Sequence, residues 1–101
     1  MVKGPLKVVI ENTARQSLLE AYHYIRKDSP KNAEKVKAKL LASMQALSKN
    51  PEMHPPDKYR QNNDGAYRAY EIYKYRITYH VSDSQITILR VRHTKMNPRS
   101  Y

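Results

Sequence analysis

The sequence predicts an α+β domain whose elements follow the order β-α-α-β-β-β. Two periodic patterns support this prediction. Residues 75–82 alternate between Tyr75, Ile77, Tyr79 and Val81 on one strand face and Arg76, Thr78, His80 and Ser82 on the other. Residues 33–47 repeat apolar side chains at helical spacing, at Ala33, Val36, Leu40, Met44 and Leu47. The strand offers one apolar face that needs a cover, and the helix supplies one.

The first two elements are a strand and a helix. Residues 6–10 are rich in β-branched side chains, which favours a short strand. Thr13 and Gln16 form a capping-box pattern, so we expect a helix to begin there and to end near Lys27.

A second helix is expected directly afterwards. Ser29 suits the N-cap and Pro30 the first helical position, while Asn50-Pro51 stops the helix. The short link between the helices predicts an antiparallel hairpin whose apolar stripes cover the sheet.

Three strands complete the predicted chain, after a polar, proline-rich connection over residues 50–65. They span residues 66–72, 75–82 and 86–93, with tight turns at 73–74 and 82–85. In the first of them, Arg68 and Tyr70 share a face, but the sequence does not say which. Residues 86–89 are continuously apolar, which indicates a central strand. We therefore predict one domain over residues 1–101, a curved, mostly antiparallel sheet with the hairpin on one face and the other face exposed.

The composition limits the possible partners. Lys and Arg number 19 against 9 Asp and Glu, a net charge of +10, which favours a polyanionic or acidic partner. The nine aromatic side chains are all Tyr, which on a basic surface suits RNA. The chain has no Cys, and its His residues lack metal-ligand spacing, so we expect no metal and no cofactor. No apolar run is long enough for a membrane helix, and we expect a cytoplasmic protein.

The chain resembles the RelE/ParE superfamily of bacterial type II toxins. The resemblance is carried by ALSKNP at the end of the second helix, the strand with Arg68, the strand YRITYHV, and the strand ITILRVRH. It implies a toxin from a toxin–antitoxin, or plasmid stabilisation, module that is neutralised by a small antitoxin. RelE-like members cleave messenger RNA on the ribosome without a metal, whereas ParE-like members poison DNA gyrase.

The resemblance also implies candidate site residues for RNA cleavage. Such cleavage needs a base, an acid, and cations that stabilise the phosphate. The catalytic candidates are Arg68, Arg76, His93, Lys95 and Tyr101. The substrate-binding candidates are Tyr70, His80, Arg90 and Arg92. Tyr70 and Thr94 stand where RelE-like nucleases carry basic residues.

Three hypotheses follow for the function. The first, which the sequence favours, is a ribosome-dependent messenger RNA endonuclease that works without a metal; it requires Arg76 and His93 to lie together on the exposed face. The second is a gyrase inhibitor without nuclease activity, which the absence of a basic residue at Tyr70 favours. The third is a basic nucleic-acid-binding module, which the charge alone permits.

Overall fold

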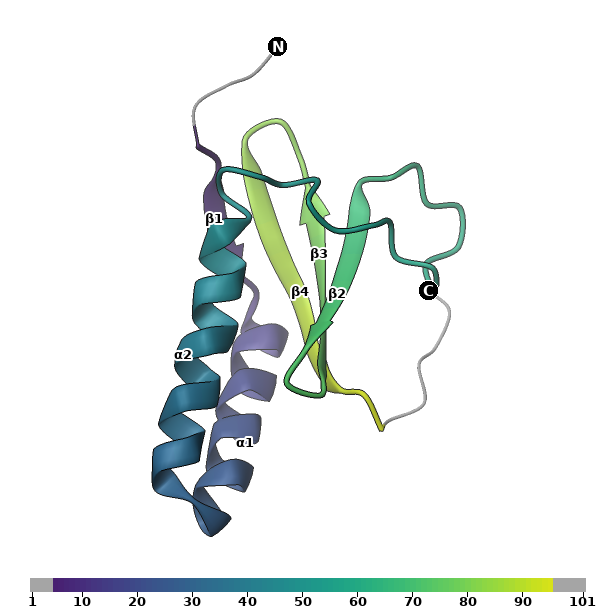
Figure 1. The fold of residues 1–101 in the computed structure, drawn as a ribbon. Coiled ribbons are helices and arrows are strands. Elements are labelled where there is room, and N and C mark those ends of the chain that lie inside the picture. Colours follow the sequence, from purple (N-terminus) through teal and green to yellow (C-terminus); the bar gives the residue numbers. More distant parts are fainter. Residues whose placement is uncertain (1–4, 96–101) are drawn as a thin grey trace.

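The computed structural model describes residues 5–95, which form two helices and one four-stranded sheet (Figure 1). The elements are β1 (Lys7–Ile10), α1 (Asn12–Asp28), α2 (Pro30–Ala46), β2 (Tyr67–Ile72), β3 (Tyr75–Val81) and β4 (Gln85–His93). The predicted fold class and element order are confirmed.

The two helices begin in different ways. Ser29 caps α2 as predicted, because its hydroxyl accepts a hydrogen bond from the Asn32 backbone N–H at 3.1 Å. The predicted capping box of α1 is wrong. The N-cap is Glu11, and its side chain makes no capping bond within the described residues. The Glu11 backbone N–H instead donates to the Ile88 carbonyl at 3.0 Å, which carries the chain from the sheet directly into the helix.

The strand order in the sheet is β1-β4-β3-β2. β1 runs parallel to β4, while the other two pairs are antiparallel. The predicted central position of the last strand is therefore correct. The register shifts between Thr78 and Tyr79, which pair with Arg90 and Ile88 and leave Leu89 as an extra residue. This bulge explains why no single alternation describes the sequence of β4.

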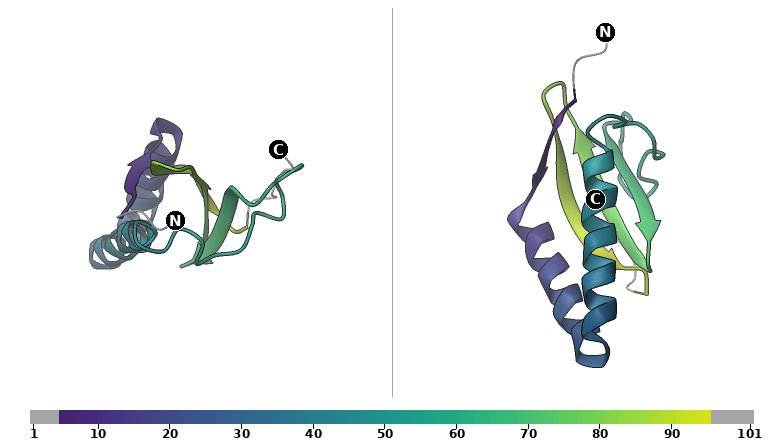
Figure 2. Two further views of the ribbon diagram at one scale, coloured as in Figure 1. Left: turned by 90° about the horizontal axis from the view of Figure 1, so that it is seen from above. Right: turned by 60° about the vertical axis from the view of Figure 1, so that its left-hand side comes forward.

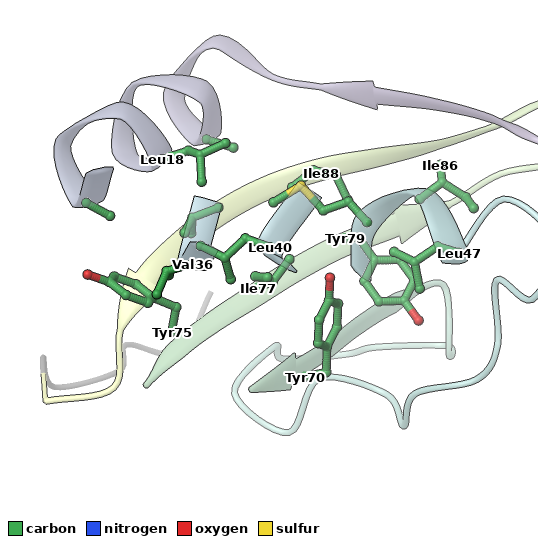
Figure 3. Packing of buried hydrophobic residues seen from close by; sticks show 14 residues of the cluster. Leu18, Val36, Leu40, Leu47, Tyr70, Tyr75, Ile77, Tyr79, Ile86 and Ile88 are labelled. Atoms are coloured by element: carbon green, nitrogen blue, oxygen red, sulfur yellow. The ribbon is translucent and has the colours of Figure 1, made fainter. Parts of the chain in front are cut away.

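The helical hairpin covers one face of the sheet, here called the inner face, as predicted (Figures 1 and 2). Tyr79, Ile77 and Ile88 project from the sheet toward Leu40 of α2 and Leu47 just after it, and all five are almost fully buried (Figure 3). Among the described residues, neither helix is both long and apolar enough to cross a membrane.

The connection between α2 and β2 runs along the free edge of β2. The Asp57 backbone N–H donates to the Tyr67 carbonyl at 2.8 Å, and the Ala69 N–H donates to the Pro55 carbonyl at 3.3 Å. Asn63 fixes the end of the connection, since its amide nitrogen donates to the Tyr67 carbonyl at 2.7 Å. The connection is thus bonded to the sheet, and it brings side chains from outside the strands to the other, outer face.

Candidate functional site

The outer face of β3 and β4 collects most of the positive charge of the sheet. Cross-strand partners share a face of the sheet. The pair Ile77–Val91 is buried on the inner face, so the neighbouring pairs Arg76–Arg92 and Thr78–Arg90 both lie on the outer face. His80 follows on the same face two residues after Thr78. Four predicted site residues are therefore brought together here: Arg76, His80, Arg90 and Arg92.

Arg76 is held by two carboxylates. Its Nη2 lies 2.7 Å from Asp57 Oδ1, and its Nη1 lies 3.3 Å from Glu71 Oε2. The Tyr59 ring also faces the guanidinium, at 4.7 Å from the ring centroid. The prediction of an exposed second face is therefore only partly correct, because the connection places Asp57 and Tyr59 over Arg76.

A second stack lies further along the outer face. The Arg60 guanidinium lies 3.6 Å from the centroid of the Tyr67 ring, and the His80 ring lies 4.6 Å from the same centroid. The predicted substrate-binding residue His80 therefore packs against Tyr67, and Arg60 of the connection contacts the same tyrosine ring.

Arg68 and Tyr70 project to the inner face, which decides the phase that the sequence left open. They pair with Tyr79 and Ile77 of the core. Arg68 donates from Nη1 to the His54 carbonyl at 2.6 Å and from Nε to the Gly65 carbonyl at 3.0 Å. Arg68 therefore hydrogen-bonds to both ends of the connection, and it lies on the opposite face of the sheet from Arg76.

Tyr70 is part of a buried aromatic group. Its ring stacks on His54 with centroids 4.1 Å apart, and its hydroxyl is 2.7 Å from Ser43 Oγ of α2. Burial raises the pKa of the Tyr70 phenol, and burial lowers the pKa of the His54 imidazole. Both effects favour the neutral forms, as expected for side chains that pack a core.

His93 also faces the inner side, at the end of β4. It pairs with Tyr75, a core residue, and the two rings meet edge to face with centroids 5.2 Å apart. Its Nδ1 accepts a hydrogen bond from the Lys95 backbone N–H at 3.1 Å. Lys95 is exposed next to it, and Tyr101 lies outside the described residues. His93 and Arg76 are therefore on opposite faces of the sheet.

The sequence agrees with one family of known proteins over most of its length. Residues 8–98 match the model of the ParE toxin of the type II toxin–antitoxin system parDE. The chain belongs to this ParE toxin family. The predicted RelE/ParE membership is thereby confirmed, and this protein is the toxin of a type II toxin–antitoxin module.

Solved structures share the fold of this ParE-family toxin. A chain of the chromosomal ParDE toxin–antitoxin system from P. aeruginosa superposes with a TM-score of 0.69 at 18% identity, covering 89% of this chain and 97% of that chain. A chain of the RelBE2 toxin–antitoxin complex from Mycobacterium tuberculosis gives a TM-score of 0.61 at 22% identity, covering 91% and 94%. No curated protein matches the sequence.

The residues that sequence reasoning missed lie in the connection of this ParE-family toxin. Asp57, Tyr59 and Arg60 contact Arg76 and Tyr67 on the outer face. Asp57 is one of three acidic residues in this polar, proline-rich segment, and nothing in the sequence distinguishes it as the one that is buried. Among residues 5–95, no group of three or more His, Cys, Asp or Glu side chains is placed to hold a metal ion.

Proposed function

We propose that this ParE-family toxin acts by binding DNA gyrase and inhibiting it, without cleaving RNA. The placement of Arg76 and His93 on opposite faces of the sheet carries the proposal. A phosphate-binding cation and a general acid or base must reach the same phosphodiester within hydrogen-bond distance. One phosphodiester on the outer face would meet Arg76 but not His93, so these residues do not form a nuclease site together.

The two ion pairs of Arg76 give further support. RNA cleavage needs cations aimed at the negative charge that develops on the phosphate. In this toxin, Asp57 and Glu71 already hold the Arg76 guanidinium, and the Asp57 side chain is 1% exposed. A phosphate would have to displace a buried carboxylate from its partner, which is unfavourable because that carboxylate would remain uncompensated.

A cognate antitoxin is the second partner that we propose. The ParE family takes its description from two-component toxin–antitoxin systems, and a net charge of +10 favours an acidic protein as the neutralising partner. If charge drives the association, the affinity decreases as the salt concentration rises.

A supercoiling assay tests the proposed target. Purified toxin is titrated into DNA gyrase with relaxed plasmid, and the same preparation is added to ribosomes programmed with messenger RNA. We expect supercoiling to stop while the message stays intact. Normal supercoiling at saturating toxin would refute the proposal.

A messenger RNA endonuclease is the second candidate function. The grouping of Arg76, Arg90, Arg92 and His80 on the outer face favours it, because a row of cations beside an imidazole suits an RNA strand. Cleavage mapping on programmed ribosomes distinguishes the two functions. Cleavage that is lost in His80→Ala and kept in His93→Ala would support a nuclease on the outer face and exclude the gyrase mechanism as the sole activity.

A further inference from the structure

The outward side of α2 carries three lysines in a row. Lys31, Lys35 and Lys39, here called the lysine row, are four residues apart, so they share one side of the helix. That side is turned away from the buried Leu40, and all three lysines are exposed. In the right-hand view of Figure 2, α2 lies in front of the sheet, and no other helix or strand of the described residues passes over its outward side. The lysine row is therefore accessible to a partner.

The charge of the lysine row is not neutralised within residues 5–95. None of the three lysines takes part in an ion pair there. Glu34 is the one acidic residue of α2, and its carboxylate accepts a hydrogen bond from the Tyr22 hydroxyl of α1. Like charges four residues apart destabilise a helix, and an anionic partner would relieve this repulsion.

The spacing of the lysine row suits a dense polyanion. Neighbouring lysines of the row are ~6 Å apart along the helix, because each residue rises ~1.5 Å. Duplex DNA carries one negative charge per ~1.7 Å of its axis, so every lysine of the row finds a phosphate within reach. Ala38, Ala42 and Ala46 are exposed on the same side of α2. Their small side chains allow a duplex to approach the helix closely.

The composition of this side favours a nucleic acid over a protein. The cores of protein interfaces are enriched in aromatic residues, Met and Arg, and they are depleted of Lys. A few such residues supply most of the binding energy. None of them is exposed on α2, where Met44 is buried. Binding to DNA needs no such anchor, because the release of counterions by the bound cations supplies the free energy.

A duplex fits this side of α2 better than a single strand does. Proteins that hold single strands stack the bases on aromatic side chains, and α2 contains no aromatic residue. Tyr22 of α1 is already engaged, since its hydroxyl bonds Glu34 and its ring centroid lies 4.7 Å from Lys37 Nζ. A duplex presents its phosphates outward, and a straight row of cations is enough to hold them.

We propose that the lysine row of α2 binds the phosphate backbone of duplex DNA without sequence preference. The row holds the toxin on the DNA on which gyrase acts, and this role rests on the function proposed above. The position of the site rests on the exposed, unneutralised charge of α2 and not on the identity of the target.

Fluorescence anisotropy of a labelled DNA duplex of about 20 base pairs tests the site, with salt varied from about 50 to 200 mM. The test variant combines Lys31→Gln, Lys35→Gln and Lys39→Gln, because Gln has nearly the helix propensity of Lys. We expect it to bind about tenfold more weakly at the lowest salt concentration. The slope of log K against log salt should decrease in magnitude by about 2.7, since each phosphate contact contributes about 0.9.

A variant with the same loss of charge provides the control. It combines Lys7→Gln, Lys74→Gln and Lys95→Gln, which replace exposed lysines outside the helices. We expect its affinity and salt slope to stay near those of the wild type. Arginine at the three positions of the lysine row should also preserve binding, because it keeps the charge. Circular dichroism verifies that every variant keeps its helices.

Three results would overturn the proposal. They are the absence of duplex binding by the wild type at the lowest salt concentration, equal losses in the test and control variants, and tighter binding of oligothymidylate or polyglutamate than of the duplex. The measurement contains no gyrase. A toxin that leaves supercoiling normal and still binds duplex DNA through the lysine row would refute the proposed target and support this site.

Discussion

The carboxylate of Asp57 lies 2.7 Å from the guanidinium of Arg76, and only 1% of the Asp57 side chain is exposed. The two residues are 19 positions apart in the sequence, one in the long connection and one near the start of β3. The same carboxylate accepts a hydrogen bond from the Tyr59 backbone N–H at 3.0 Å. This ion pair therefore fastens the connection to the outer face and determines what that face presents to a partner.

Removing the Asp57 carboxylate should destabilise the toxin strongly. The Arg76 side chain is 14% exposed and forms ion pairs with Asp57 and Glu71. In Asp57→Ala only the ion pair with the solvent-exposed Glu71 remains of these two. Breaking a buried ion pair at one partner costs about 3 kcal/mol. We expect a loss of that size in the free energy of unfolding, measured by urea denaturation.

Glu71→Gln is the matched control for this ion pair. The Glu71 side chain is 55% exposed, and its contact with Arg76 is longer, at 3.3 Å. Exposed ion pairs contribute about 0.5 kcal/mol. Equal losses in Asp57→Ala and Glu71→Gln would show that burial does not set the strength of these contacts.

The fold could be predicted from the sequence because its main signals are local. The alternation in β3 and the apolar stripe of α2 each identify an element and its buried face, and the Ser29-Pro30 pair marks the start of a helix. The covering of one sheet face by the hairpin then follows from general packing rules, and the apolar start of the last strand indicates its central position. The capping box failed because a backbone bond from Glu11 to the sheet fixes the start of α1 instead.

The candidate site could be predicted only in part, because faces and partners depend on distant residues. The phase of β2 is set by its pairing with β3, which turns Arg68 inward, and the bulge at Leu89 puts Val91 and His93 on the inner face with Ile88. The periodicity of the sequence predicts neither the phase of β2 nor the position of this bulge. The partner of Arg76 comes from a segment without periodicity, where a buried acid looks like any loop residue.

The stability of the toxin should fall in mild acid because of His54. Burial lowers the pKa of its imidazole below the ordinary value of 6.5. The unfolded chain then binds a proton more readily than the folded protein. Stability from this group is complete above pH 6.5 and is lost as the pH falls through the folded pKa. Urea denaturation at a series of pH values between 7.5 and 5 should show this decrease.

A phenylalanine at position 54 provides the control for this pH dependence. His54→Phe keeps an aromatic ring on Tyr70 and removes the titrating group. We expect the variant to lose less stability than the wild type between pH 7.5 and 5. An identical pH profile in both proteins would assign the acid sensitivity to other groups.

Replacing the unpaired hydroxyl of Thr78 should stabilise the toxin in the absence of partners. Valine has the same shape and suits a strand, and Thr78→Val removes a buried polar atom that lacks a partner in the described structure. We expect a gain of about 1 kcal/mol in the free energy of unfolding. Thr87→Val should give no such gain, since the Thr87 hydroxyl is bonded to Gln85. A loss of stability in Thr78→Val would mean that the hydroxyl is satisfied in solution.

The turn between β2 and β3 should also be improvable, because it forces two ordinary residues into a left-handed conformation. Tyr73 has φ 52° and Lys74 has φ 67°, which is the geometry of a type I′ hairpin turn, where Asn-Gly is preferred. Tyr73 is 43% exposed, so its replacement removes little packing. Tyr73→Asn with Lys74→Gly should raise the free energy of unfolding by about 1 kcal/mol, as measured by urea denaturation.

The hairpin between β3 and β4 provides the control for this prediction. Asp83 in that turn does not have a positive φ, so Asp83→Gly should destabilise the toxin slightly through the added flexibility of the unfolded chain. A gain from Asp83→Gly as large as that from the double substitution would show that the backbone conformation is not the cause.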